Sequence, residues 1–593
     1  MGTPSLPQND KHKKCRNKQL QKYRNRYRFN YNIIPTLGFS DSVPKTEYPR
    51  FKWIWILIEI GVQLLRNSLA SSARTAHKFG KFFLPIWFRI KYYTRLILNT
   101  IATKDPTSFF YIAAANIQKY VPMGQGATLK DYDALFATIK NPDPNHEFLT
   151  DENFVRMRIA GWNPTLITSI QSLPSKVDFS NSQFTSLGAF ADDSLQNALK
   201  EKRIFIVDYK DLENIQAGDQ PNGQKFSYAP IALFALDKTR ETLYPIAIQC
   251  GQERKKFATI TPNSGKWTWN IAKTIVNSAD GNYHELIAHL GKTHLFTEPF
   301  VVATYRQLAK RHPIHRLLVP HFQGTIFINY LAKTKLIAPG GGVDFLLAGE
   351  ILSETVAAIE VVGKESFNDS MFPKSFALKG VEKDVLKEYP YRDDGLLNWK
   401  AIHKWVEDYT NIYYESNKDI QQDQELQLWA DEVCSESGGR IKDFGEDGKG
   451  KLSTKKYLVD ALTNVIFTAS CSHASVNFPQ RGLMMSTPQA PLATYKEFPV
   501  KGKEYTEEDL VAALPPLDMA SLQLSLGYTL GGVYYTKLGK YRCGFSDGRV
   551  KPFLYDFQKE LRENEKIIQE RNKQREKPYT YMMPSKIPQS INI

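Results

Sequence analysis

Histidine is concentrated in one short stretch of the chain. Six of the eleven histidines lie between residues 284 and 321, in HELIAHLGKTH followed by HPIHRLLVPHF. Neutral imidazole is the commonest metal ligand among side chains, so this density indicates a metal site. A zinc-protease helix is not indicated, because three residues separate His284-Glu285 from His289 where that motif has two.

The second and third histidines of this run are also five residues apart. On an ideal α-helix, residues i and i+5 point in different directions. A π-type turn, with hydrogen bonds from i to i+5, would stack His289 over His294, and such turns concentrate at functional sites. We therefore predict a π-helical turn that brings these two rings to one face.

A further candidate pair lies in CSHASVNF, where His473 and Asn477 are four residues apart and share one face of an α-helix. Neutral imidazoles with oxygen donors suit ferrous iron or a similar divalent ion, and the lack of nearby thiolates argues against structural zinc. A histidine taken singly is more often a core or surface residue than a ligand. The metal prediction depends on the joint pattern.

Three segments together resemble the lipoxygenase family in order and spacing: residues 284–337, HASVNFPQ at 473–480, and the end of the chain at Ser590, Ile591, Asn592 and Ile593. The similarity covers roughly residues 105–593. The resemblance implies one non-haem iron that alternates between Fe2+ and Fe3+. Its implied ligands are His289, His294, His473, Asn477 and the terminal carboxylate of Ile593.

The resemblance also assigns roles outside the ligand set. Gln480 matches a glutamine that hydrogen-bonds near the asparagine ligand, and Ala332 matches a position that influences product chirality. Leu336 and Ile337 match residues that flank the substrate, and Leu346 and Leu347 lie near where pocket depth is set. Ordinary core packing explains these four apolar residues equally well. The implied non-ligands are His284, His312, His315 and His321.

The activity implied by the resemblance is addition of O2 to a polyunsaturated fatty acid of the linoleate or arachidonate type. A bis-allylic methylene loses a hydrogen atom, and a hydroperoxide forms. Two alternatives stay open from the residues. One is a hydroperoxide isomerase or another lipid-metabolising variant built on the same iron domain. The other is a non-catalytic membrane-binding protein whose histidines are structural.

Net charge divides the chain into two parts. Residues 1–100 hold 19 Lys and Arg and 4 Asp and Glu, a net charge of +15 that equals the net charge of the whole chain. The basic run KHKKCRNKQLQKYRNRYR is read either as a solvated tail or as part of a surface-binding segment. Two apolar patches follow at residues 53–66 and 81–98. Each pattern fits either a helix that lies at a membrane interface or a helix that is buried in the fold.

We predict from these features a basic amphipathic helical extension over residues 1–105 that binds an anionic membrane surface. No nucleic-acid-binding motif accompanies the charge. Five cysteines without a Cys-x-x-Cys pair predict neither a disulfide framework nor a thiolate site. A cytoplasmic, peripherally membrane-associated location is therefore expected.

The expected fold is mainly α, with a large helical lipoxygenase-type catalytic domain and a minor sheet over residues 106–593. Residues 228–237 and 243–250 predict strands, residues 267–335 and 399–472 predict mostly helix, and residues 436–454 predict an exposed loop. Many lipoxygenases begin with a β-barrel lipid-binding domain. Residues 1–105 lack its strand alternation, so the resemblance is to bacterial or cyanobacterial members without that domain.

Overall fold

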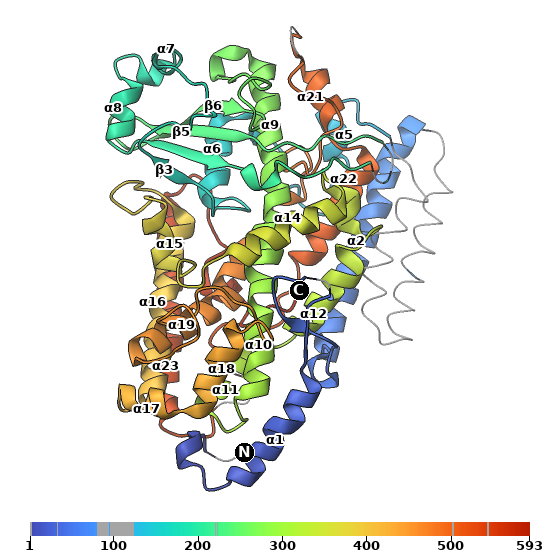
Figure 1. Ribbon diagram of the computed structural model, residues 1–593. Helices are drawn as coiled ribbons and strands as arrows, with labels where there is room; N and C mark the ends of the chain where they lie inside the picture. Colours follow the sequence, from blue (N-terminus) through green and yellow to red (C-terminus); the bar gives the residue numbers. More distant parts are fainter. Residues whose placement is uncertain are drawn as a thin grey trace.

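The computed structural model describes residues 3–32, 34–79, 94, 124–219, 221, 223–500, 503–541 and 545–593. The fold is mainly helical, as the sequence predicts, with a small sheet at one end (Figure 1). Long helices run from the sheet toward the opposite end, near which the N-terminus lies. The C-terminus lies within the body, and residues 587–593 are all buried.

The four-stranded sheet is antiparallel throughout, in the order β3 (Thr168–Ile170), β4 (Ile204–Asp208), β5 (Ile231–Leu236) and β6 (Leu243–Gln249). Every residue of β5 is buried. Alternate side chains of β5 enter two separate apolar clusters, Ile231 on one face and Phe234 on the other, so both faces of the sheet are covered. The two predicted strands are confirmed within narrower limits as β5 and β6.

The basic run at the N-terminus forms helix α1 (Lys13–Arg26), so a solvated tail is wrong for it. Arg16 is buried and forms ion pairs with Asp10 and with Glu425, whose Oε2 lies 2.8 Å from Arg16 Nη2. Glu425 belongs to α18 (Gln424–Cys434) of the helical body. A buried carboxylate paired with a buried guanidinium therefore fixes α1 in place.

The first apolar patch lies in helix α2 (Phe51–Phe79). Its buried face includes Trp53, Leu57 and Leu64, whereas the polar residues Glu59, Gln63 and Arg66 are exposed. The second patch, residues 81–98, lies outside the described residues except for residue 94. A pair of two-residue strands, β1 (Phe29–Asn30) and β2 (Phe39–Ser40), precedes α2 and is too short for a sequence pattern to indicate.

Within the described ranges, no single helix combines the length and the apolarity needed to cross a bilayer. The helices α21 (Glu507–Ala513) and α22 (Leu517–Leu530), taken together, have the length and the apolarity of a bilayer span, but the pair is bent by 63° at the break between them.

The centre of the body is one uninterrupted helix, roughly 60 Å long. It consists of α9 (Lys266–Tyr283), the π-helix η7 (His284–Leu295) and α10 (Phe296–Gln307). From Trp269 to Tyr283 every residue is buried, which places this helix inside the fold. The predicted π-helical turn is confirmed, and it is longer than the single turn that the spacing indicates.

A second long helix, which is interrupted, packs against the central one. It runs through α19 (Lys455–Phe467), the π-helix η10 (Thr468–Ser472), α20 (His473–Asn477) and the π-helix η11 (Gln480–Met484). The His284 ring contacts the carbonyl oxygen of Val476 at 2.7 Å and so connects η7 directly to α20. Between α18 and α19, residues 436–454 form the predicted loop, with neither helix nor extended strand. It is exposed only in part, because Ile441, Phe444 and Leu452 are buried.

The remaining helices surround these two. They are α5 (Leu129–Asp133), α6 (Asp151–Ala160), α7 (Asn181–Thr185), α8 (Leu195–Lys200), α11 (Pro313–Leu318), α12 (Thr325–Leu331), the π-helix η9 (Ala332–Leu336), α13 (Gly342–Leu346), α14 (Ile351–Lys364), α15 (Phe372–Leu378), α16 (Pro390–Asn411), α17 (Asn417–Gln422) and α23 (Val550–Gln574). Short 3-10 turns are η1 (Pro7–Asn9), η2 (Lys45–Glu47), η3 (Glu147–Leu149), η4 (Gly188–Phe190), η5 (Lys210–Leu212), η6 (Pro262–Ser264), η8 (Val319–His321) and η12 (Pro584–Lys586).

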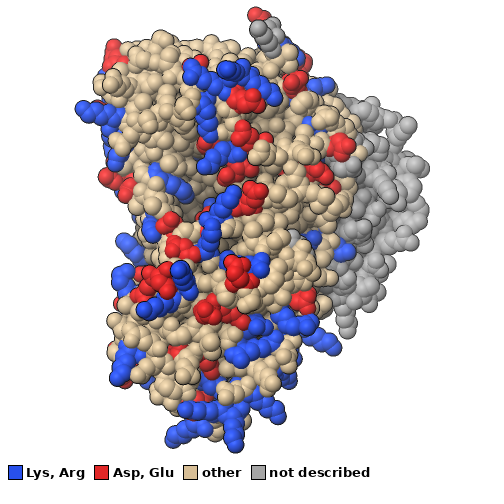
Figure 2. All heavy atoms as spheres, in the orientation of Figure 1, with Lys and Arg blue, Asp and Glu red and all other residues tan. Residues whose placement is uncertain are grey.

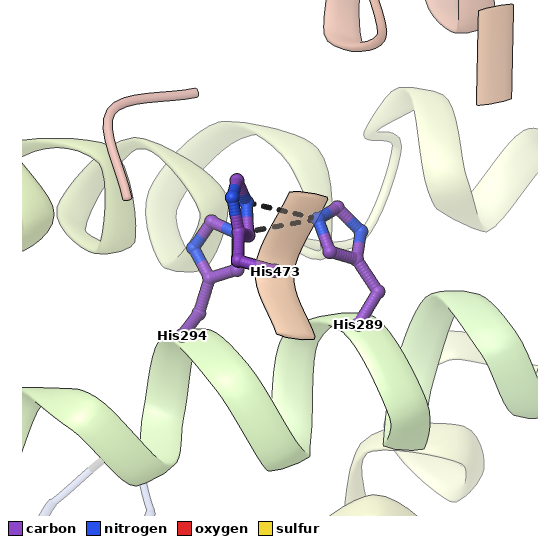
Figure 3. Close-up of side chains that lie close together, drawn as sticks. All are labelled: His289, His294 and His473. Atoms are coloured by element: carbon purple, nitrogen blue, oxygen red, sulfur yellow. Dashed lines mark hydrogen bonds between the residues drawn. The ribbon is translucent and has the colours of Figure 1, made fainter. Parts of the chain in front are cut away.

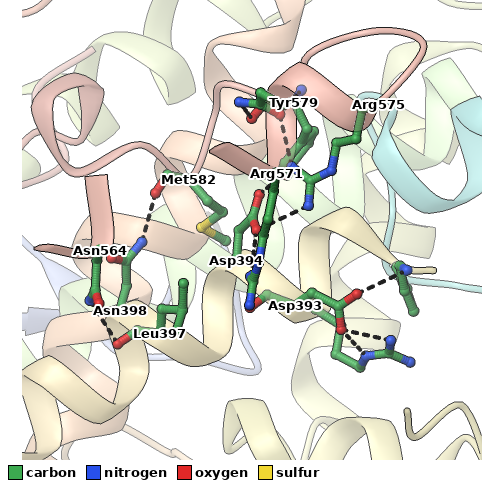
Figure 4. Close-up of polar contacts among 12 residues, drawn as sticks. Asp393, Asp394, Leu397, Asn398, Asn564, Arg571, Arg575, Tyr579 and Met582 are labelled. Carbon is green, nitrogen blue, oxygen red and sulfur yellow. Dashed lines mark hydrogen bonds and ion pairs between the residues drawn. The ribbon is translucent and has the colours of Figure 1, made fainter. Parts of the chain in front are cut away.

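Helices α16 and α23 are joined by a buried charge cluster that fixes the path into the C-terminal tail (Figure 4). The carboxylate of Asp394 is fully buried and lies 2.8 Å from Arg571 and 2.6 Å from Arg575. The amide of Asn398 donates to the carbonyl of Met582, 2.8 Å away. The chain that leaves α23 is therefore attached to the body before the tail begins.

Candidate metal centre and its pocket

Three imidazole rings meet inside the body: His289 and His294 from η7, and His473 from α20 (Figure 3). Their Nε2 atoms are 3.1, 3.3 and 3.4 Å apart. Ligand atoms about 2.1 Å from a common metal ion lie about 3.0 to 3.4 Å apart at the usual angles. The three nitrogens therefore have the separations of neighbouring ligands around one ion.

Burial keeps the three rings neutral. It lowers the pKa of His289, lowers that of His473 well below its ordinary value, and with repulsion from His289 brings the pKa of His294 to about 3. Neutral rings carry nitrogen lone pairs, and converging lone pairs repel one another. A cation bound between them would remove that repulsion, so the donor set fits a divalent transition-metal ion.

Asn329 of α12 sets the orientation of the His294 ring. Its Oδ1 lies 2.9 Å from Nδ1 of His294, and its Nδ2 donates to the carboxylate of Glu298 at 2.7 Å and to the carbonyl of His294 at 3.0 Å. Because Nδ2 has two acceptors, Oδ1 must face the ring. The proton of His294 is then on Nδ1, and the lone pair on Nε2 is available to a metal.

Glu285 lies beside the other two rings of η7. Its carboxylate oxygens are 3.4 Å from His284 Nδ1 and 3.9 Å from His289 Nδ1. Burial alone would raise its pKa, but interactions with the two imidazoles outweigh burial and bring the pKa to about 2. A fixed negative charge therefore lies behind the His289 ring and favours the tautomer whose Nε2 lone pair faces the cluster.

The side chain of Asn477 is also held in one orientation. Its Nδ2 donates to the carbonyl of Leu530 at 3.1 Å, and its Oδ1 accepts a hydrogen bond from Nε2 of Gln480 at 3.2 Å. Both amides are buried. The family resemblance implies this contact between Gln480 and Asn477, and Gln480 comes from the π-helix η11 that follows α20.

The C-terminal tail reaches the same region. Ile593 is 4% exposed and lines one cavity together with His289 and His294. A hydrogen bond with the Ile593 backbone partly offsets the effect of burial on the pKa of His473. The residues before it are tied by hydrogen bonds from Thr325 to the Ile591 carbonyl (3.1 Å) and from Ser590 to the Gln323 carbonyl (2.9 Å). The tail is thus fixed along its length.

The other histidines of the run have separate surroundings. His312 contacts Asp423 at 2.9 Å and accepts from the backbone N–H of Ile314, which caps α11. His321 contacts the carbonyl of Gln589 at 2.9 Å and so holds the tail. His315 is buried against Tyr305. These rings and His284 lie outside the three-histidine cluster.

The cavity next to the cluster has mostly apolar walls. The predicted specificity residues Ala332, Leu336 and Ile337 line it. Leu346 and Leu347 are buried but are not among its described lining residues. The other described lining residues are Glu285, His289, Leu290, His294, Ile328, Leu331, Lys335, Val343, Leu530 and Ile593.

The segment with Leu346 and Leu347 is held by a buried amine. Nζ of Lys225 donates to the carbonyls of Phe345 at 3.0 Å and Leu347 at 2.7 Å. Burial lowers the pKa of Lys225 to about 8. A lysine whose donors bind backbone carbonyls fixes the position of this segment, which follows Val343 of the cavity wall in the sequence.

Several residues of the site were not found from the sequence. Asn329 is a lone amide in the apolar run TIFINYL, and that contrast could have marked it as a buried polar residue with a partner. Glu298, inside the central helix, is likewise a polar residue among mostly apolar neighbours in the sequence. No sequence pattern marks Leu530 or Lys225, because only the tertiary fold brings them close to the histidine cluster and its cavity.

We expect Asn329→Leu to weaken the binding of a divalent transition metal by 10- to 100-fold, because the ring of His294 loses its orienting acceptor. His294→Ala should weaken it further, since a ligand atom is lost. Titration calorimetry with Mn2+ measures both. The matched control is Asn464→Leu, which removes another buried amide, hydrogen-bonded to Ser370. Parent-like affinity in Asn329→Leu would show that Asn329 does not orient the ligand.

The comparisons with known proteins agree with this geometry. A model of the lipoxygenase family matches residues 114–584. The linoleate 9/13-lipoxygenase of Pseudomonas aeruginosa is 39% identical over 491 residues, which cover 79% of this chain and 70% of the relative. The human polyunsaturated fatty acid lipoxygenase ALOX15B is 32% identical over 481 residues, with coverage of 79% and 70%.

Solved structures give the same result at the level of the fold. The crystal structure of a coral 8R-lipoxygenase superposes with a TM-score of 0.82 and 26% identity, over 100% of this chain and 83% of that chain. A lipoxygenase crystallised in complex with arachidonate superposes with a TM-score of 0.84 and 26% identity, over 100% and 84%. The family match, the relatives and the histidine cluster lead to one conclusion: the chain belongs to the lipoxygenase family.

Proposed function

We propose that this enzyme is a non-haem iron dioxygenase that converts polyunsaturated fatty acids and O2 to hydroperoxides, the parent compounds of the oxylipins. The observation that carries the proposal is the convergence of three neutral imidazoles beside an apolar cavity. The substrate class is supported by the names of the relatives, which specify linoleate and polyunsaturated fatty acids, and by the arachidonate bound in a similar structure.

The proposed iron ligands are His289, His294, His473, Asn477 and the carboxylate of Ile593. Three imidazoles, one amide oxygen and one carboxylate form a moderate donor set, which leaves the oxidised metal able to accept an electron. The hydrogen bonds that fix Asn477 and the tail support the last two ligands. Gln480 is a positioning residue in this proposal, because it acts through the amide of Asn477.

Iron held there would supply the one-electron oxidation that removes a hydrogen atom from a bis-allylic methylene. The chain itself holds and orients the substrate. The apolar walls bind the hydrocarbon and exclude water, so that one methylene is held toward the histidine cluster. O2 then adds to the substrate radical, and a returning hydrogen atom completes the hydroperoxide, so that both oxygen atoms enter the product.

We assign Ala332, Leu336 and Ile337 to contact with the pentadiene, because they line the cavity beside the histidines. Leu346 and Leu347, which are buried and do not line the described cavity, would act on pocket depth through the neighbouring wall residue Val343. Removing the Ala332 methyl group in Ala332→Gly opens space beside the pentadiene, so we expect a measurable change in the chirality or position of the hydroperoxide. Chiral chromatography of the linoleate product tests this. An unchanged profile would reduce Ala332 to packing.

The activity and the tail ligand are tested together. Purified enzyme should take up O2 with linoleate and contain about one iron per chain. Adding one glycine after Ile593 should abolish both, because the carboxylate would move about 3.5 Å along the chain, beyond the roughly 2 Å length of a metal–oxygen bond. Oxygen uptake and elemental analysis give the two readouts.

The control is Ile593→Val, which keeps the terminal carboxylate and should keep iron and activity. Full iron content in the extended chain would contradict the assignment of Ile593 as a ligand, but it would not contradict the dioxygenase proposal. If the iron-loaded parent takes up no O2 with free fatty acid but consumes a fatty acid hydroperoxide, the dioxygenase proposal fails. The alternative of a hydroperoxide isomerase is then supported. This is the activity that the name of another relative specifies.

We further propose that residues 1–105 bind an anionic membrane surface, which would make the enzyme peripherally membrane-associated in the cytoplasm. The proposal is supported by the net charge of +15 in residues 1–100. It is also supported by Phe51 and Trp55 at the start of α2, which are 75% and 50% exposed. Basic residues near such a surface contribute about 1 kcal/mol each and act within about 10 Å at 0.1 M salt.

Phe51→Ser with Trp55→Ser should therefore lower sedimentation with anionic vesicles severalfold and leave turnover of detergent-dispersed fatty acid unchanged. The matched control is Leu352→Ser with Val356→Ser, which removes two similarly exposed apolar residues from α14. Binding should also weaken at high salt. Equal sedimentation of both double variants and the parent would leave α2 as a packing helix only.

A further inference from the structure

A second cavity lies between the N-terminal segment and the C-terminal tail. Its volume is about 1040 Å³, and its walls come from α1, residues 46–53, α11, the described residues of 534–546, and residues 585–592. Among the described lining residues, it shares only Ile328 with the cavity at the histidine cluster. It is therefore a separate space, adjacent to the metal region.

The walls of this second cavity carry a large excess of positive charge. One carboxylate, Glu47, is found among the described lining residues. The basic residues are Arg26, Arg50, Lys52, Lys310, Arg316, Lys537, Lys540 and Lys586. Arg26, Arg50 and the five lysines form no ion pair with an acidic residue in the described part of the chain. Figure 2 shows Lys and Arg gathered at the end of the molecule where α1 lies.

Glu47 does little to balance this charge. It is 6% exposed, and its carboxylate accepts a hydrogen bond from the Tyr27 hydroxyl at 2.8 Å. Burial raises its pKa. The basic residues of the walls outnumber this one carboxylate, so the cavity keeps a net positive charge that favours the binding of an anion.

A buried imidazole gives an independent sign of a ligand. His315 lines the cavity and is 6% exposed, and neither of its ring nitrogens has a hydrogen-bond partner within the described structure. Nearly all buried polar atoms in folded proteins have a partner. A donor and an acceptor at this wall are thus available to a bound polar molecule.

We propose that this cavity binds a small molecule with two or more phosphate groups. Phosphate supplies several acceptor oxygens and a divalent charge, which match a ring of lysine and arginine donors better than a single carboxylate does. The volume is of the size that small-molecule sites have. Tyr48, Trp53 and Phe327 add aromatic wall, which suits an organic phosphate ester.

Such a ligand would act on the tail. Trp53 and Asn592 both line the cavity, and the indole of Trp53 donates to the Asn592 carbonyl at 2.7 Å. Lys586 and Gln589 belong to the same wall and to the same tail. Binding therefore joins residues 50–53 to residues 586–592 and should slow hydrogen exchange in the peptide that contains the last residues of the chain.

Inorganic tripolyphosphate is the probe for the test, with the full-length iron-loaded enzyme. We expect it to bind in titration calorimetry, to raise Tm and to slow amide exchange in residues 585–593. Lys537→Gln, Lys540→Gln and Lys586→Gln combined should weaken binding at least tenfold. The control combines Lys200→Gln, Lys400→Gln and Lys418→Gln, three exposed lysines outside this cavity with the same loss of charge.

Equal affinity in the two triple variants at constant ionic strength would overturn the proposal, because binding would then follow net charge only. No binding of tripolyphosphate to the parent, together with equal sedimentation of both variants with phosphatidate-containing vesicles, would also overturn it. If only vesicle binding is lost in the cavity variant, the bound phosphate is the single phosphate of a lipid headgroup, and the proposal of a small molecule with two or more phosphate groups is overturned. If only tripolyphosphate binding is lost, the phosphate is that of a soluble ligand.

Discussion

Neutral imidazoles whose lone pairs point at one place repel one another, so the surrounding chain must prevent the rings from turning away. The π-helix meets the first part of this constraint. Residues five apart on an α-helix are about 140° apart around the axis. Wider turns with i to i+5 bonding bring His289 and His294 to one face, where Nε2 of each is within 3.4 Å of His473.

Burial and oriented amides meet the second part. The rings stay neutral because charged forms are costly in this interior. Nδ1 of His294 is held by Asn329, whose own amide is held by Glu298. Each of these groups is buried, so a missing partner would leave an unpaired polar atom. The histidine cluster is thus supported by a connected set of hydrogen bonds.

Sequence spacing predicted the elements of the site that depend on local geometry. The five-residue spacing predicted that His289 and His294 share a face, and apolar runs located β5 and β6. Contacts between distant segments could not be predicted in this way. The carbonyl of Leu530 holds Asn477, and Lys225 holds the chain at Leu347, because segments far apart in sequence pack together. Docking of α1 through Arg16 and Glu425 escaped prediction for the same reason.

The N-terminal segment takes part in the support of the metal centre from two sides. The backbone N–H of Ser40 in β2 donates to Glu298 at 2.8 Å, and Glu298 accepts from Asn329, which orients His294. On the other side, Trp53 of α2 donates to the carbonyl of Asn592, one residue before Ile593. Because both routes end at proposed iron ligands, residues 37–57 stabilise the catalytic body, whatever surface the rest of the segment binds. The same segment contacts both Glu298 and Asn592. A ligand or surface that binds this segment can therefore change the position of the C-terminal tail.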